Sequence, residues 1–178
     1  MPAAPALVVL GGLPGVGKST IARALLRQWP AVYLRIDTIE QALRDGGALG
    51  GSGVGAAGYV VAYALARTHL SQGLPVLADC LNPWAETRAS WRRVALDAQA
   101  PMLAVEVVCG DPAEHRRRVE QRVSDVPGLV PPLWDAVCRH DYVPWAVNNN
   151  QLVVDTARRS PGETATHVLA ALRERAAG

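Results

Sequence analysis

The stretch "ALVVLGGLPGVGKST" (residues 6–20) decides how this chain begins to fold. Its first half is a short apolar run, which favours a buried strand. Glycines then interrupt the run, and "KSTIARALLRQW" (18–29) follows with the apolar spacing of an amphipathic helix. A strand that turns through glycines directly into a helix is typical of α/β proteins with a parallel sheet.

Within this stretch, "GLPGVGKST" (12–20) fits the P-loop pattern, in which glycine-rich backbone wraps around phosphate oxygens at the start of a helix. We expect Lys18 to reach the β- and γ-phosphates of a nucleotide and the Ser19 hydroxyl to coordinate Mg²⁺. An ordinary glycine-rich turn would leave the order Gly-Lys-Ser unexplained. The predicted nucleotide contacts are Gly12, Leu13, Pro14, Gly15, Val16, Gly17, Lys18, Ser19 and Thr20.

Composition narrows the class of protein further. The chain has 178 residues, 49% of them hydrophobic, and a net charge of +2, which predicts a globular protein and gives no support to nucleic-acid or membrane binding. We expect neither a signal peptide nor a membrane span, and a cytoplasmic location. Lys18 is the single lysine beside seventeen arginines, so position 18 uses a compact point charge where every other basic position uses a planar fork.

Strand and helix patterns alternate beyond residue 20. Apolar runs predict further strands, and each is followed by a helical pattern, so we expect a five-stranded parallel sheet covered on both faces, in one domain over residues 1–178. The stretch 46–58 contains seven glycines and should be a mobile loop. The further strands are expected at 31–36, 74–80, 101–109 and 151–156, and helices at about 38–44, 59–72, 83–99, 111–123, 133–140 and 160–176.

Three acids stand at predicted strand ends, where open α/β folds bind ligands. Asp79 ends "LPVLADC" and is expected to hold a water on Mg²⁺. Asp155 ends "QLVVDT" and is interpreted as a loop-shaping acid near the nucleotide base. Asp37, in "IDTIE", has two interpretations, because with Glu40 it also forms a capping box. It is only a helix cap, or it is a general base, and one side chain can also serve as both.

The helix expected at 111–123 carries "HRRRVEQR". Arg118 and Arg122 are four residues apart and share a face, so they are predicted to close over the triphosphate and balance charge in phosphoryl transfer. Arg116 and Arg117 point elsewhere. The alternative is a solvated basic helix that pairs with its own acids. We expect residues 111–145 to form a lid segment.

Taken together, these motifs resemble the small P-loop kinases, the superfamily that includes chloramphenicol phosphotransferase, gluconate kinase, adenylyl-sulfate kinase and the kinase domain of polynucleotide kinase. The resemblance implies a three-layer P-loop NTPase fold with strand order 2-3-1-4-5, and a cofactor pair of ATP and Mg²⁺. It implies that Asp37 takes the proton of an acceptor hydroxyl and that Arg118 and Arg122 are the paired lid arginines. Residues 156–161 should lie near the adenine.

The chain also departs from these relatives. Polynucleotide kinases have an arginine three residues after the general base, whereas this chain has Glu40, an acid that should repel a nucleic-acid phosphate. A kinase for a small-molecule hydroxyl is therefore the first hypothesis, and a polynucleotide 5′-hydroxyl kinase is the second. A nucleotide-dependent switch or ATPase with a protein partner is a third.

The acceptor itself is not predicted by these motifs. Asn82, Trp84, Trp134 and Tyr142 are the candidates to line its pocket, together with Asp37. An aromatic pocket would suit a nucleoside or a drug-like hydroxyl compound, and a polar one would suit a sugar or sugar acid.

Overall fold

The computed structural model describes residues 5–47, 53–145 and 151–176. All five predicted strands are present, and they form one parallel sheet in the order β2-β3-β1-β4-β5, which confirms the predicted fold. The strands are β1 (Leu7–Gly11), β2 (Val32–Arg35), β3 (Val76–Asp79), β4 (Met102–Val108) and β5 (Gln151–Asp155).

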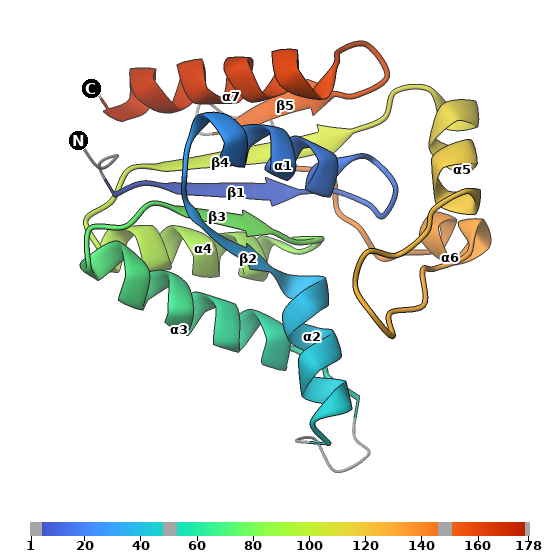
Figure 1. Cartoon of the computed structure of the whole chain (residues 1–178), viewed down its shortest axis with the longest axis horizontal. Helices are drawn as coiled ribbons and strands as arrows, with labels where there is room; N and C mark the ends of the chain where they lie inside the picture. Colours follow the sequence, from blue (N-terminus) through green and yellow to red (C-terminus); the bar gives the residue numbers. More distant parts are fainter. Residues whose placement is uncertain (1–4, 48–52, 146–150, 177–178) are drawn as a thin grey trace.

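Helices cover both faces of the sheet and its carboxyl edge (Figure 1). One face carries α1 (Lys18–Gln28) and α7 (Pro161–Ala176), and the other carries α3 (Ala57–Ser71) and α4 (Ala85–Asp97). At the carboxyl edge lie α2 (Ile36–Asp45), α5 (Pro112–Glu120) and α6 (Trp134–Cys138). The part of the Gly-rich stretch at 48–52 lies outside the described residues.

The central strand β1 explains why the sheet needs two helical layers. Its five residues are all buried, and successive side chains point to opposite faces. Val8 and Leu10 pack among residues of α1 and α7. Leu7 and Val9 pack among residues of α3 and α4. An apolar run without alternation is what a strand buried on both faces requires.

One local prediction was wrong. The helix after β2 begins at Ile36 rather than near Thr38, and Arg35 takes the cap position without a side-chain cap hydrogen bond. The reason is that β2 passes into α2 without a connecting residue. Asp37 therefore stands in the first helical turn, where a carboxylate also suits the helix dipole. The helix-cap interpretation of Asp37 does not apply.

Two other predicted helix starts agree with the structure. The Asp111 carboxylate accepts hydrogen bonds from the amides of Ala113 (2.9 Å) and Glu114 (3.2 Å), and it caps α5. Ser160 and Glu163 form a reciprocal capping box at the start of α7. Among the described residues, none of the helices combines the length and apolar character that crossing a membrane requires.

Candidate active site

The P-loop curls around the N-terminus of α1. Gly12, Gly15 and Gly17 have φ angles of 143°, 83° and 101°, a region that glycine enters without steric cost. The Lys18 ammonium donates hydrogen bonds to the carbonyl oxygens of Gly12 (2.7 Å) and Leu13 (3.0 Å). The loop and its lysine thus have the conformation that phosphate binding needs.

The charges around Lys18 come from three other elements. Burial lowers the pKa of Lys18, the Asp79 and Asp37 carboxylates oppose that change, and Arg122 adds to it. The charges that act on Lys18 thus come from the end of β3, the first turn of α2 and the turn after α5. Burial removes water from around this ammonium, and a bound polyphosphate would stabilise its charge in place of that water.

A hydroxyl and a carboxylate lie beside the lysine. Ser19 Oγ donates a hydrogen bond to Asp79 Oδ2 (2.7 Å), and the Tyr33 hydroxyl donates to the same oxygen (2.7 Å). Burial raises the pKa of Tyr33, and Asp79 raises it further, so Tyr33 remains a donor. These hard oxygen ligands fit Mg²⁺, which binds through one or two protein oxygens plus phosphates and waters. Consistent with that economy, the described residues contain no cluster of three or more metal-ligating side chains.

Asp37 lies between two guanidinium groups. Its Oδ2 is 3.7 Å from Arg35 Nη2 and 3.6 Å from Arg122 Nη2. Arg35 is buried, whereas Asp37 is about half exposed, so part of its carboxylate remains accessible to a ligand. This is the placement that a proton acceptor at a binding cavity needs.

The lid segment, residues 111–145, is tied to the sheet edge by Asp125. This carboxylate accepts from Arg35 Nη1 (2.8 Å) through one oxygen and from Arg23 Nη1 (2.9 Å) through the other. The hydrogen bond from Arg35 lowers the pKa of Asp125. Arg35 therefore contacts both Asp37 and the lid segment.

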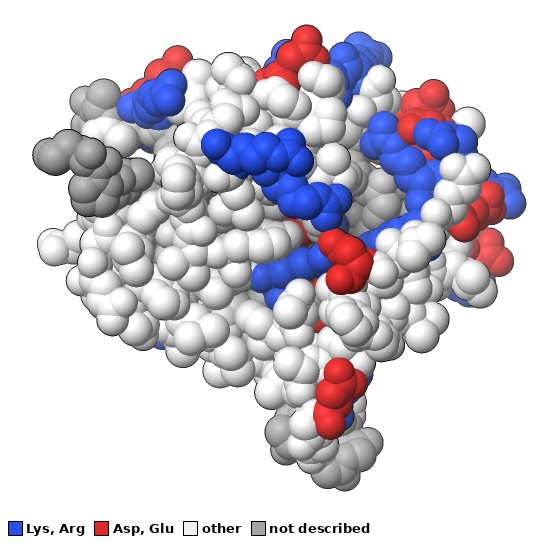
Figure 2. All heavy atoms as spheres, viewed as in Figure 1, with Lys and Arg blue, Asp and Glu red and all other residues white. Residues whose placement is uncertain are grey.

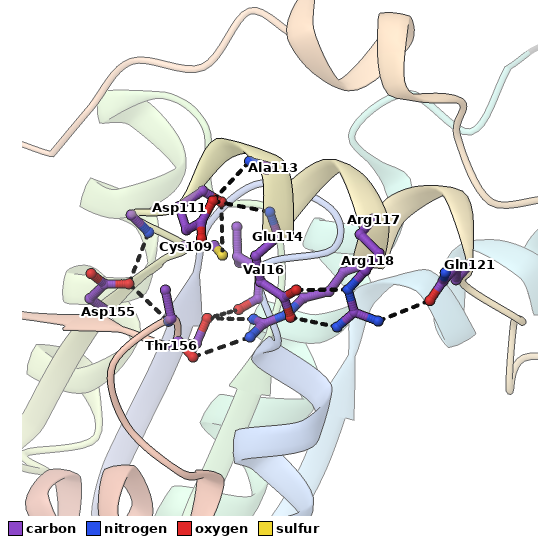
Figure 3. A network of polar contacts seen from close by, with 12 residues as sticks. Val16, Cys109, Asp111, Ala113, Glu114, Arg117, Arg118, Gln121, Asp155 and Thr156 are labelled. Atoms are coloured by element: carbon purple, nitrogen blue, oxygen red, sulfur yellow. Dashed lines mark hydrogen bonds and ion pairs between the residues drawn. The ribbon is translucent and has the colours of Figure 1, made fainter.

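Helix α5 makes a second connection, drawn in Figure 3. Arg118 donates to the side-chain oxygen of Thr156 (2.8 Å), to its carbonyl (3.2 Å) and to Glu114 (2.7 Å). The Thr156 hydroxyl donates to the carbonyl of Val16 in the P-loop (2.8 Å). Hydrogen bonds from Arg117 and Arg118 lower the pKa of Glu114 to about 2. In this arrangement Arg118 joins α5 to the P-loop and to the residues after β5.

Asp155 shapes the loop that carries Thr156. Its Oδ1 accepts from the amides of Gly110 (2.9 Å) and Ala157 (3.0 Å), so it links the ends of β4 and β5. The bond from Gly110 lowers the pKa of Asp155.

A cavity of about 1320 Å³ opens at the carboxyl edge of the sheet. Its walls include residues of the P-loop, Asp37 and Asp79, so the structure brings the predicted phosphate, metal and acid residues to one space. The arginines of α5 and its following turn that line it are Arg117, Arg118 and Arg122, so the prediction that Arg117 points elsewhere was wrong. Figure 2 shows basic and acidic side chains gathered around the hollow on this side of the molecule.

Of the four predicted acceptor residues, Trp84 alone is among the described residues that line this cavity. Asn82 is buried, and its backbone amide donates to the Tyr59 hydroxyl (2.8 Å). The Trp134 ring packs edge-on against His115, with centroids 5.1 Å apart. The Tyr142 hydroxyl donates to Glu106 (2.8 Å). The structure does not place these three with Asp37.

Sequence reasoning missed Tyr33 and Arg35. Both lie in "YLRID", where they alternate with the buried Leu34 and so point to the same side of β2. That alternation next to an acid was the available signal. Asp125 carried no comparable signal, because its partners are about 90 and 102 residues away along the chain.

Comparisons with known proteins agree with this architecture. A family model described as AAA domain matches residues 7–130. No curated protein sequence matches the chain. A candidate kinase from Chloroflexus aurantiacus has a TM-score of 0.74 and 22% identity, over 97% of this chain and 98% of the other.

Two further solved structures are similar. The APS kinase of Mycobacterium tuberculosis, solved with AMPPNP and APS, has a TM-score of 0.68 and 24% identity, over 97% of this chain and 99% of the other. Kti12 of Chaetomium thermophilum, solved with ADP-AlF3, has a TM-score of 0.70 and 22% identity, over 97% and 100%. At these identities the similarity establishes a shared fold.

Proposed function

The chain belongs to the AAA domain family, and from that premise we propose that it is an ATP-dependent phosphotransferase. It moves the γ-phosphoryl group of ATP, bound with Mg²⁺, to a hydroxyl group of a small molecule. The observation that carries this proposal is the position of Asp37, which lines the same cavity as Lys18, Ser19 and Asp79. A protein that only hydrolyses its nucleotide also needs a group that orients the attacking water. Asp37 supports transfer to an alcohol because the cavity that it lines continues along Tyr59 and Trp84, where an acceptor can bind.

The nucleotide side of the mechanism uses the P-loop. Its backbone amides and Lys18 hold the β- and γ-phosphates, while Ser19 and Asp79 would hold Mg²⁺, which neutralises phosphate charge when bound. Arg118, through Thr156, keeps α5 docked beside the loop. Closure of the lid segment excludes water, which would otherwise attack the γ-phosphorus.

The acceptor side uses Asp37. The acceptor hydroxyl donates to the Asp37 carboxylate, which receives its proton as the hydroxyl oxygen bonds to the γ-phosphorus. The bond from that phosphorus to its bridging oxygen breaks, and ADP leaves. Arg122, at 3.6 Å from Asp37, and Lys18 balance the charge that is transferred. Phosphoryl transfer relies mainly on positioning and charge balance, so Asp37 orients the hydroxyl as well as accepting its proton.

Glu40 favours a small molecule over a polynucleotide. It lines the cavity one helical turn after Asp37, and its nearest basic partner is Arg44, at 3.5 Å. An acid at this point opposes the approach of a phosphodiester backbone.

The variant Asp37→Asn tests this assignment. It keeps the shape of the side chain and removes its ability to accept a proton, so we expect MgATP binding to persist and phosphoester formation to fall by about 10²–10⁴-fold. Calorimetry would measure binding, and transfer of labelled phosphate would measure the rate. Wild-type transfer in this variant would contradict a role for Asp37 as base.

A further inference from the structure

The cavity has two chemically different halves. The strand order places β2 and β3 on one side of the P-loop strand and β4 and β5 on the other. We define the acceptor half as the part walled by residues that follow β2 and β3, with the part of the lid segment that faces them. It extends from Asp37 away from the P-loop.

The wall of the acceptor half is apolar and aromatic. Val60 is 61% exposed, Trp84 46% and Val130 85%, although each is a side chain that folding normally buries. Clustered apolar side chains left open around a cavity mark the surface where a ligand binds. The residues of this wall that matter here are Tyr59, Val60, Tyr63, Trp84, Leu129 and Val130.

Lysine and arginine are absent from the acceptor half as far as the structure describes its lining, and His140, from the segment after α6, is the imidazole that lines the cavity. The lysine and arginines that line the cavity come from α1, the end of β2, α5, its following turn and the segment after β5. Of these, Arg35 is committed to Asp125 at 2.8 Å and Arg122 lies against Asp37 at 3.6 Å.

The charges that the acceptor half does carry are negative. Glu40 and Glu86 line it. Gly58 of α3 leaves room for the Glu40 side chain: a Cβ at position 58 would come 2.5 Å from Glu40 Cγ and 3.1 Å from its Oε1. Its ion-pair partner Arg44, 3.5 Å away, does not line the cavity, so an anionic acceptor would meet the carboxylate of Glu40 rather than the guanidinium of Arg44.

We propose that the acceptor is an alcohol with an aromatic or branched apolar body and no anionic group, and that a protonated amine on it pairs with Glu40. This inference rests on the proposed function and specifies its acceptor. It excludes sugar acids, nucleotides and the phosphorylated ends of nucleic acids, because each brings negative charge to a wall that offers acids and apolar groups.

Three matched probes test the charge preference. They share one frame, a primary alcohol on a carbon that also bears a benzyl group, and differ in the third substituent: an amine (phenylalaninol), a carboxamide (2-benzyl-3-hydroxypropanamide) or a carboxylate (2-benzyl-3-hydroxypropanoate). We would measure their affinity for the MgADP-bound protein by calorimetry. We expect the amine and the amide to bind at least about tenfold more tightly than the carboxylate, since one close like-charge contact costs more than 1 kcal/mol. Equal or reversed affinities, or binding by none of the three, would overturn the inference.

Variants assign the preference to residues. Glu40→Gln should reduce the amine-to-carboxylate ratio several-fold, while Glu120→Gln, an exposed change outside the cavity lining, should leave the ratio as it is in the wild type. Because the ratio is taken within one variant, a general loss of folded protein cannot produce this result. Trp84→Ala should weaken all three benzyl probes and leave 2-amino-1,3-propanediol, which lacks the ring, unchanged. An unchanged ratio in Glu40→Gln would remove Glu40 from the proposal.

Turnover assays distinguish a failure of this inference from a failure of the proposed function on which it rests. Phosphoester formation on a sugar acid such as gluconate, with none on the amine probe, would overturn the acceptor class and support the kinase proposal. Label that appears as inorganic phosphate alone, whatever alcohol is added, would overturn the kinase proposal and the acceptor class with it.

Discussion

At the scale of single residues, two carboxylates of the site have different surroundings. Asp79 is buried and accepts two hydroxyl hydrogen bonds on one oxygen. Asp37 is half exposed and faces two guanidinium groups. The first environment suits a fixed metal-site acid, and the second suits an acid that meets a substrate. We therefore propose separate tasks for the two acids at this sheet edge.

The metal role of Asp79 gives a direct prediction. In Asp79→Asn the Mg²⁺ concentration that half-saturates nucleotide turnover should rise by about 10–100-fold, because outer ligands tune metal affinity by that much. Nucleotide binding without Mg²⁺ should weaken little or improve, since an anion near the phosphates is lost. A Mg²⁺ titration of wild type, Asp79→Asn and Tyr33→Phe measures the effect, with the smaller shift expected for Tyr33→Phe. The same half-saturation in all three proteins would remove Asp79 from the metal site.

The lowered pKa of Lys18 predicts a proton effect on binding. In the free protein, burial disfavours the ammonium form, and bound phosphates favour it, so nucleotide binding raises the pKa of Lys18. Between the two pKa values binding must take up a proton, and affinity must fall as pH rises through that alkaline window. Calorimetry in two buffers of different ionisation enthalpy would measure the uptake.

Lys18→Arg serves as the control for that measurement, because a guanidinium does not titrate in this window. Proton uptake that persists in Lys18→Arg would assign the effect to another group. The same lowered pKa affects stability. Between the folded and unfolded pKa values of Lys18, the folded chain holds fewer protons on this residue than the unfolded chain does, so its contribution to the free energy of unfolding increases as the pH rises.

The positions of site residues were predictable only where a local pattern fixes them, and their roles remain predictions. Lys18 and Ser19 have fixed places in a motif, and Asp37 and Asp79 stand at strand ends. Tyr33 and Arg35 were missed because their partners follow from the packing of β2 beside β3, where Tyr33 pairs with Leu77 and Arg35 with Asp79. Nothing in the local sequence reports that register.

At the scale of elements, the lid segment returns to the strand from which the P-loop starts. Gly11 ends β1, and a Cβ placed on it would overlap the indole of Trp145 and come 3.1 Å from Asn82 Cβ. The amide of Trp145 donates to the buried Glu106 on β4 (3.2 Å). The far end of the lid segment is thus packed against the residue that precedes the loop.

This contact predicts how much one added methyl group at position 11 lowers the stability of the protein. Gly11→Ala should lower the free energy of unfolding by about 1–3 kcal/mol, as overpacking of a filled core does. Urea unfolding would measure it. Gly162→Ala, in an open position of α7, is the matched control and should change stability by less than about 1 kcal/mol. In the double variant Gly11→Ala/Trp145→Leu the two losses should not add, since the clash is gone. Additive losses would contradict the packing argument.

Element prediction succeeded where periodicity is long and failed at junctions. The strands and the caps of α5 and α7 were anticipated, because apolar runs and capping residues are local signals. The start of α2 was not, because a strand that passes into a helix without a loop has no turn residues in the sequence to mark the boundary. Apart from Trp84, the acceptor wall was also missed, since α3, the start of α4 and the lid segment converge only in the folded chain.

At the scale of the whole molecule, the fold separates charge. The cations on the nucleotide side come from α1, α5 and the segment after β5, and the described acceptor wall on the other side is apolar or acidic. Asp37, Arg35 and Arg122 stand at the boundary. We expect this division to direct a polyanion to one half and a second substrate to the other. Such a division would suit the proposed transferase better than a protein that only hydrolyses its nucleotide.

The measurement that tests the account most directly follows the label of γ-labelled ATP. The purified protein would be given MgATP with and without a panel of alcohols: the benzyl probes, nucleosides, sugars, sugar acids and a 5′-hydroxyl oligonucleotide. The account predicts that an alcohol without anionic groups becomes a labelled phosphoester, and that release of inorganic phosphate without an acceptor is slow. Label found as inorganic phosphate alone, at the same rate with every alcohol and in Asp37→Asn, would contradict it and point to a nucleotide-driven switch.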